Sequence, residues 1–246
     1  MHVLLVALLV AIVAGILEWD IYGWGQTMIS RPVVAGPIMG LILGDMKTGL
    51  YIGATIEMMY LGTIPVGAAI PPDPTAATAI ATSIAILSGI DPKAAPALAV
   101  PVAMAAQSLQ MLIWTGNVGL THKADKYAEA GNIKGMEKIH ITGSFLFFLQ
   151  GFVPAFVATL FGVSAVKLVI QHIPTWFMNG LTVAGGMLPA LGFAMLFTMM
   201  SSKKLLPYFI IGFVVAAFFK ATLIAAAALG VGAMLLHLNK FEKSEA

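Results

Sequence analysis

Long stretches without a charged residue or a histidine divide the chain into apolar segments. Three of them have the length of membrane-crossing helices: Ala94–Thr121, Ile141–Val166 and Ile173–Ser202. A helix needs about 20 apolar residues to cross the hydrocarbon core of a bilayer. Four shorter runs are marginal by this measure: Val3–Leu17, Pro74–Ile90, Leu205–Phe219 and Ala221–Leu236. The pattern predicts an all-α, polytopic membrane protein.

The region Pro32–Pro72 has a different pattern. Asp45, Lys47 and Glu57 divide it into pieces of 13, 9 and 15 uncharged residues, none of which is a comfortable full span. Short apolar segments that are interrupted by glycine and proline indicate broken or re-entrant helices. Irregular backbone at membrane depth must be buried in protein or must line a wet cavity.

The centre of this break is the proline-rich stretch between two apolar runs. Its prolines cannot all lie within one regular helix, because each lacks an N–H group and crowds the preceding turn. We predict a helix that ends near Leu61, an unwound turn from about Gly67 to Pro74, and a new helix after it. Asp73 and Thr75 are the N-cap candidates for that second helix.

The composition supports a membrane protein and excludes several other classes. Hydrophobic residues make up 59% of the chain and charged residues only 10%, with a mean hydropathy of +0.94, whereas soluble domains carry about 25% charged residues. The chain has no cysteine, which excludes disulfides and thiol catalysis. Its net charge of +2 is spread over the loops, so we expect no nucleic-acid-binding face.

The two ends of the chain and the polar segment His122–His140 give the predicted organisation. The first apolar run lacks a basic leader and a cleavage site, so we interpret it as a retained membrane helix. We expect one transmembrane domain over residues 1–238 and a soluble tail over 239–246. The four lysines of His122–His140 place that segment in the cytoplasm, where it is expected to form a short surface helix.

Two carboxylates flank the predicted break. Glu57 is a candidate site residue, because an acid in a hydrocarbon environment is costly unless it faces protein or water. The structural alternative is an acid that is protonated or paired with a lysine. Asp73 has the simpler alternative of an N-cap that satisfies free N–H groups, and a cap at a broken helix can also face a substrate.

Two amides inside the long uncharged runs are further candidates. Gln107 and Asn179 can each donate and accept hydrogen bonds, which suits a sugar hydroxyl. Hydrogen bonding between helices is the structural alternative for both. The five histidines fall at segment ends and form no metal-binding pattern, so we expect neither a metal nor a cofactor.

Four stretches carry a family resemblance: "RPVVAGPIMGLILGDMKTGLYIGATIEMMYLG", "GAAIPPDPTAA", "HKADKYAEAGN" and "NGLTVAGGMLPALGFAML". Through them the chain resembles the IIC membrane component of the mannose/fructose/sorbose-type bacterial phosphotransferase system, from Arg31 to beyond Leu205. The "LGDMKTG" block followed by "GATIEM" is the most specific part of the match.

The resemblance implies a sugar-transport subunit of the bacterial inner membrane that acts with partners. It implies a IID membrane chain, soluble IIA and IIB proteins that carry phosphoryl groups on histidines, and a homo-oligomer of IIC–IID pairs in the bilayer. The implied sugar site includes Glu57 and the "GAAIPPD" turn with Gly67, Ala68 and Asp73. By extension it includes Gln107 and Asn179.

The residues leave alternatives open. A proton-coupled secondary sugar transporter would use Glu57 or Asp73 as the group that cycles a proton. A membrane-embedded enzyme has little support, because the chain has no Ser/His dyad spacing, no HExxH and no P-loop. We therefore expect a permease subunit whose phosphoryl-transfer residues lie on partner chains. The sugar is a hexose or an amino sugar, with weak similarity to the N-acetylgalactosamine branch.

Overall fold

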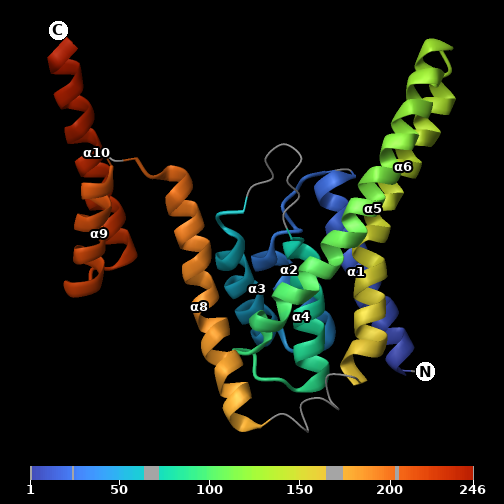
Figure 1. Ribbon diagram of the computed structural model, residues 1–246, viewed down its shortest axis with the longest axis horizontal. Helices are drawn as coiled ribbons and strands as arrows, with labels where there is room; N and C mark the ends of the chain where they lie inside the picture. The colour runs from blue at the N-terminus through green and yellow to red at the C-terminus, as the bar shows by residue number, and fades with distance from the viewer. Residues whose placement is uncertain (1, 24, 64–71, 165–173, 203–204, 246) are drawn as a thin grey trace. The chain divides into compact units, whose positions relative to one another are not determined.

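The computed structural model describes residues 2–23, 25–63, 72–164, 174–202 and 205–245. Within these ranges the regular elements are all helical, as predicted (Figure 1). In chain order they are α1 His2–Tyr22, α2 Pro32–Leu43, α3 Met46–Tyr60, α4 Pro74–Ser88, α5 Ala95–Glu129, α6 Ile133–Val157, the π-helical segment η1 Ala158–Gly162, α8 Thr175–Met200, α9 Leu206–Phe218 and α10 Leu223–Glu245. Residues 1–196 and 197–246 form two compact units.

Four helical segments are long and apolar enough to cross a membrane: Val3–Tyr22, Ala95–Glu129, Ile133–Gly162 and Thr175–Met200. The last three overlap the three long uncharged stretches, so those predicted spans are confirmed. The first is longer than the apolar run Val3–Leu17 on which its prediction rested. It continues through Glu18 and Asp20 to Tyr22, because both acids are buried inside the protein.

The polar segment His122–His140 is the tip of a helical hairpin rather than a separate surface helix. Helix α5 continues to Glu129, Gly131 turns the chain with a φ of 62°, and Asn132 caps α6 by accepting the N–H of Gly135 at 3.0 Å. The 35 residues of α5 measure about 52 Å at 1.5 Å per residue. This helix is therefore longer than the roughly 30 Å hydrocarbon core.

Helices α2 and α3 form a tight hairpin around glycines. A Cβ atom on Gly36 of α2 would lie 2.3 Å from the carbonyl oxygen of Gly49 on α3, and one on Gly53 would lie 2.3 Å from that of Pro32. Small residues allow such backbone-to-backbone approach in membrane helices. The hairpin turn is closed by Asp45, whose carboxylate accepts the N–H of Thr48 at 3.0 Å.

The break between α3 and α4 falls where the sequence predicts it. Helix α3 ends at Tyr60, and α4 begins at Pro74 with Asp73 as its N-cap, accepting the N–H of Ala76 at 2.9 Å. The predicted turn residues Gly67 and Ala68 lie outside the described residues. The N-cap prediction for Asp73 is confirmed.

Helix α4 lies at the centre of residues 1–196, where it contacts α1, α2, α3, α5 and α6. Every residue from Thr75 to Ala85 is buried. One face packs with α1 and α2, through Ala79, Ile80, Val10, Ala14, Leu17, Ala35 and Met39. The other packs with α3 and α5, through Ala77, Ala81, Ile52, Ile56, Met59, Ala95, Ala99 and Ala103. Alanine and threonine on α4 let five neighbouring helices approach it closely.

In residues 197–246, α9 contacts α10, and the rings of Phe197 and Phe209 pack at 4.3 Å between centroids. None of the side chains of α9 is buried. Helix α10 reaches Glu245, so the predicted tail begins within a helix. The division between a membrane domain and a tail at residue 238 stays a prediction.

Candidate functional site

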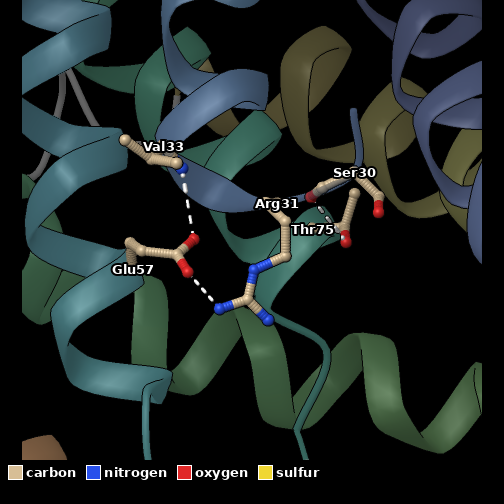
Figure 2. Close-up of polar contacts among 5 residues, drawn as sticks. All are labelled: Ser30, Arg31, Val33, Glu57 and Thr75. Carbon is tan, nitrogen blue, oxygen red and sulfur yellow. Dashed lines mark hydrogen bonds and ion pairs between the residues drawn. The ribbon is translucent and has the colours of Figure 1, made fainter. Parts of the chain in front are cut away.

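Glu57 forms a salt bridge with Arg31, the only arginine of the chain (Figure 2). Its Oε1 accepts from Nη2 of Arg31, and its Oε2 accepts the backbone N–H of Val33 at 3.3 Å. Val33 lies in the first turn of α2, where free N–H groups and the helix dipole favour a negative charge. The carboxylate is thus paired with an arginine, whereas the structural alternative considered from sequence named a lysine.

The pair is accessible. The side chain of Arg31 is 44% exposed and that of Glu57 is 16% exposed. Arg31 is not among the site residues predicted from sequence. The signal was present, because the only arginine of the chain begins the longest matching stretch, which also contains the acid Glu57.

The segment around Arg31 connects the two helices that flank the break. The carbonyl oxygen of Ser30 accepts the hydroxyl of Thr75 on α4 at 3.1 Å, while Arg31 and Val33 hold Glu57 on α3 (Figure 2). Asp73 lies two residues before Thr75. The structure therefore places the surroundings of Glu57 and of Asp73 on the two sides of one short segment.

Asp73 is buried, with 3% of its surface exposed, and it contacts a second acid. Its carboxyl group is within hydrogen-bonding reach of Glu18 on α1. Glu18 is also buried, and its Oε1 accepts from Nε2 of the buried Gln150 on α6 at 2.7 Å. The contact between α1 and α6 is made possible by Gly151, whose Cβ, if present, would lie 2.4 Å from the carbonyl oxygen of Ala14.

Glu18 is likewise absent from the predicted site, because its position only marks the end of the first apolar run. A signal existed in the helical spacing: Ala7, Ala11, Ala14 and Glu18 recur at intervals of three or four residues, which is the spacing of one helix face. Small residues on that face indicate close helix packing. An acid at the end of such a stripe is therefore directed into the protein.

A third buried acid, Asp20, has partners of its own. Its Oδ1 accepts the N–H of Thr27 at 2.9 Å and the hydroxyl of the same residue at 2.7 Å. These bonds fix the chain that leaves α1. Asp20 therefore has a structural explanation.

The two amide candidates lie on α5 and α8. Gln107 is half-buried and lies one turn before Gln110, whose Nε2 donates to the hydroxyl of Tyr22 at 3.2 Å. Asn179 is exposed. Among the described contacts, no hydrogen bond joins Asn179 to Glu57 or to Asp73. In the part of the chain that the structure describes, no three His, Asp or Glu side chains gather to hold a metal ion.

Its long apolar helices, packed around buried acids that are hydrogen-bonded, define this chain as a polytopic membrane protein. The family model "PTS system sorbose-specific iic component" matches residues 4–236. The chain therefore belongs to this family of IIC components of the phosphotransferase system, which are membrane-embedded sugar-transport subunits of the bacterial inner membrane and work with other subunits of that system. A proton-coupled secondary transporter is not favoured.

Relatives support the same assignment. The fructose permease IIC component of Bacillus subtilis (strain 168) is 38% identical over 243 residues, covering 99% of this chain and 89% of the relative. The mannose-specific EIIC component of Escherichia coli (strain K12) is 39% identical over 210 residues, covering 85% and 79%. The N-acetylgalactosamine permease IIC component 1 of the same strain is 32% identical over 203 residues, covering 82% and 76%.

Two solved structures resemble the fold. One, described as the structure of a membrane protein, has a TM-score of 0.86 at 37% sequence identity. The other is a cryo-electron microscopy structure of the mannose transporter ManYZ in complex with microcin E492, with a TM-score of 0.61 at 38% identity. Each match covers 96% of this chain and 95% of the matched chain.

Proposed function

We propose that Arg31 and Glu57 contact the transported sugar directly. The observation that carries this proposal is the accessibility of a charged pair beside a helix break, with 44% and 16% of the two side chains exposed. A sugar hydroxyl both donates and accepts hydrogen bonds. The guanidinium supplies donors and the carboxylate supplies acceptors, and such charge-assisted bonds are stronger than neutral ones.

Asp73 has a supporting role in this proposal. It is buried and caps α4, so it fixes the helix whose first turn is tied to Ser30 beside Arg31. Gly67 and Ala68, which precede this cap in the sequence, are retained as part of the proposed site. Gln107 and Asn179 are retained as secondary contacts, because their amides match a hydroxyl in donor and acceptor capacity.

The substrate is a hexose or an amino sugar. The relatives are described as permeases for fructose, mannose, sorbose and N-acetylgalactosamine, at identities from 32% to 39%. These values do not separate one sugar from another. A panel of labelled fructose, mannose, sorbose and N-acetylgalactosamine is therefore the first substrate screen.

A second membrane chain of the IID type completes the proposed transport unit. The side chains of α9 are not buried within this chain, and much of the apolar surface of α8 is exposed as well, including Trp176, Val183, Met187 and Leu191. Lipid and a partner helix can both cover such surfaces. The similarity to the mannose transporter ManYZ, whose name joins two components, supports a unit of two membrane chains. We propose further assembly of these pairs into a homo-oligomer.

The hairpin tip of α5 and α6 is the proposed contact for phosphorylated IIB on the cytoplasmic face. Helices α5 and α6 run side by side in Figure 1 and end in a capped turn. The tip carries four lysines, Lys123, Lys126, Lys134 and Lys138, which favour the cytoplasm. IIA, in this proposal, acts only by supplying IIB with the phosphoryl group.

The experiment that tests the proposal measures sugar phosphate. Vesicles that contain this chain and its IID partner are supplied with phosphorylated IIB and a labelled sugar. We expect labelled sugar phosphate to form in the presence of phosphoenolpyruvate and to be unaffected by a protonophore. Glu57→Gln is expected to reduce product formation by roughly tenfold or more, because hydrogen bonds to a charged group are worth about 1.5–3 kcal/mol.

The matched control is Asp91→Asn. It removes the same charge from an exposed turn, and the amide oxygen retains the acceptor for the N–H of Lys93. Wild-type product formation in a correctly inserted Glu57→Gln protein would refute the site. Delivery of free sugar that stops with a protonophore would refute group translocation.

A further inference from the structure

The contact between Glu18 and Asp73 joins three helices at a buried point. Glu18 comes from α1 and Asp73 from the N-terminus of α4, and Gln150 of α6 donates to Glu18 and lies within hydrogen-bonding reach of Asp73 as well. One oxygen of each acid has a defined donor. Oε1 of Glu18 accepts from Nε2 of Gln150 at 2.7 Å, and Oδ1 of Asp73 accepts from the N–H of Ala76 at 2.9 Å.

The other oxygens of the pair have no donor among the described residues. Oε2 of Glu18 and Oδ2 of Asp73 are buried and lack a hydrogen-bond partner. Two ionised carboxylates would present only acceptors to each other, and two like charges in contact in an apolar interior strongly oppose each other's ionisation. A single proton between them removes one charge and supplies the missing donor for both oxygens.

In the part of the chain that the structure describes, no positively charged side chain acts on the pair and could take the place of this proton. The titratable groups that face the pair are the hydroxyls of Tyr22 on α1 and Tyr60 on α3, and an ordinary tyrosine is neutral near pH 7. From α5, Gln110 contacts Tyr22, and from α6 the neighbour is Gln150, and neither amide can carry a charge. Among the described residues, Arg31 forms its salt bridge with Glu57 and not with the buried acid pair.

The position of the proton follows from what each acid contacts. Asp73 lies at the N-terminus of α4, where the free N–H groups and the positive end of the helix dipole stabilise a carboxylate. Glu18 has only neutral donors near it, the amide of Gln150 and the hydroxyl of Thr75, and it lies inside a helix, without such a field. The ionised form is therefore better stabilised at Asp73.

We propose that Glu18 is a neutral carboxylic acid that donates its O–H to Oδ2 of Asp73, and that it acts as a positioning residue for the N-terminus of α4. The bond ties α1 and α6 to the cap of α4. Its importance for transport rests on the proposed sugar site beside Ser30 and Thr75. The protonation of Glu18 does not depend on that site and can be tested without sugar.

The first test is infrared spectroscopy of the purified complex in its membrane form. We expect the C=O stretching band of a protonated carboxylic acid at neutral pH, with a shift to lower frequency in D₂O. The band is expected to be lost in Glu18→Gln and kept in Glu57→Gln, because Glu57 is a salt-bridged carboxylate. A Glu18→Gln spectrum with the wild-type band would overturn the proposal, and so would a wild-type spectrum without one.

The second test compares two substitutions at the same position in the vesicle assay. In Glu18→Gln, the amide Nε2 can donate to Asp73 and the amide oxygen can accept from Gln150, so we expect product formation within about twofold of wild type. Glu18→Leu removes the donor and leaves a buried charged acceptor unpaired, and it is expected to lower product formation by roughly tenfold or more. Equal losses in both variants would show that Glu18 acts as an anion.

The pH dependence of transport distinguishes a hydrogen-bonding role of Glu18 from a role in packing alone. Transport by the wild type is expected to fall at alkaline pH, when Glu18 loses its proton and the pair becomes doubly charged. Glu18→Gln has no proton to lose at this position, so the alkaline decline is expected to be weaker than in the wild type. An identical decline in both proteins would contradict the proposal, even if Glu18→Leu fails to insert. If the infrared spectra are as expected but Glu18→Leu transports sugar as well as the wild type does, only the link between Glu18 and the sugar site is refuted.

Discussion

The Arg31–Glu57 pair and the Glu18–Asp73 pair stabilise carboxyl groups inside an apolar protein in different ways. Glu57 has an arginine and a backbone N–H as partners and remains partly accessible. Asp73 has a helix N-terminus and a second acid as partners and is buried. The difference indicates that a charged, accessible pair can bind a polar ligand, whereas a buried acid pair is suited to holding helices together.

The largest effect is expected when the accessible pair loses its cation. Arg31→Gln leaves Glu57 only 16% exposed and without its counter-charge. Breaking a fully buried ion pair costs about 3–5 kcal/mol, and the exposure of Arg31 reduces this figure through solvent screening. We expect sugar phosphate formation to fall by more than tenfold, in excess of the loss in Glu57→Gln.

The double variant Arg31→Gln/Glu57→Gln sharpens this prediction. If the two side chains act as a pair, the double variant is expected to lose less than the sum of the two single losses, with a coupling of about 0.5–3 kcal/mol. Strictly additive losses would show that Arg31 and Glu57 contribute independently of each other, and would contradict a functional role of their salt bridge.

A smaller effect is expected at the buried pair when the cap is removed. Asp73→Ala deletes the acceptor for the N–H of Ala76, and loss of an N-cap costs about 0.5–2 kcal/mol. Asp73→Asn keeps a cap oxygen and is the matched control. We expect the thermal unfolding midpoint of the purified complex to fall clearly more in Asp73→Ala than in Asp73→Asn. The reverse order would contradict the capping role.

Removal of the side-chain amide of Gln150, which donates to Glu18, is expected to lower stability less than removal of the Asp73 cap does. Gln150→Leu deletes the 2.7 Å bond to Glu18 while filling a similar volume. One such bond contributes about 1 kcal/mol to stability. We therefore expect a small drop in the unfolding midpoint and unchanged sugar affinity, and a large rise in KM would show that Gln150 itself belongs to the sugar site.

The smallest effects are expected at the two remaining amide candidates. Gln107→Ala and Asn179→Ala each remove a neutral side chain that can bond to a hydroxyl, and a neutral hydrogen bond is worth about 0.5–1.5 kcal/mol. We expect KM for the sugar to rise by roughly two- to tenfold with kcat retained. An effect larger than that of Glu57→Gln at either position would reverse the ranking of the site residues.

Much of this arrangement follows from sequence, because it depends on local rules. Uncharged runs predict the long helices, and the prolines before Pro74 together with Asp73 predict the break and its cap. The partners of the two acids do not follow in this way. Arg31 is 26 residues from Glu57 and Glu18 is 55 residues from Asp73, and no local pattern gives the packing of α1 against α4. The stripe of small residues that ends at Glu18 indicates which face of α1 is buried, but it does not say which helix packs against that face.

The glycine contacts of α2 and α3 have a mechanical consequence. Where Gly36 meets Gly49, backbone touches backbone, and no side-chain rotamers are available there to absorb sliding between the helices. Closely packed elements of this kind transmit strain rather than deform. We therefore expect α2 and α3 to move as one rigid unit. A rearrangement of this unit during a transport cycle is then expected to bend the chain at its two ends, before Pro32 and after Tyr60. The Arg31–Glu57 salt bridge lies at one of those bending points.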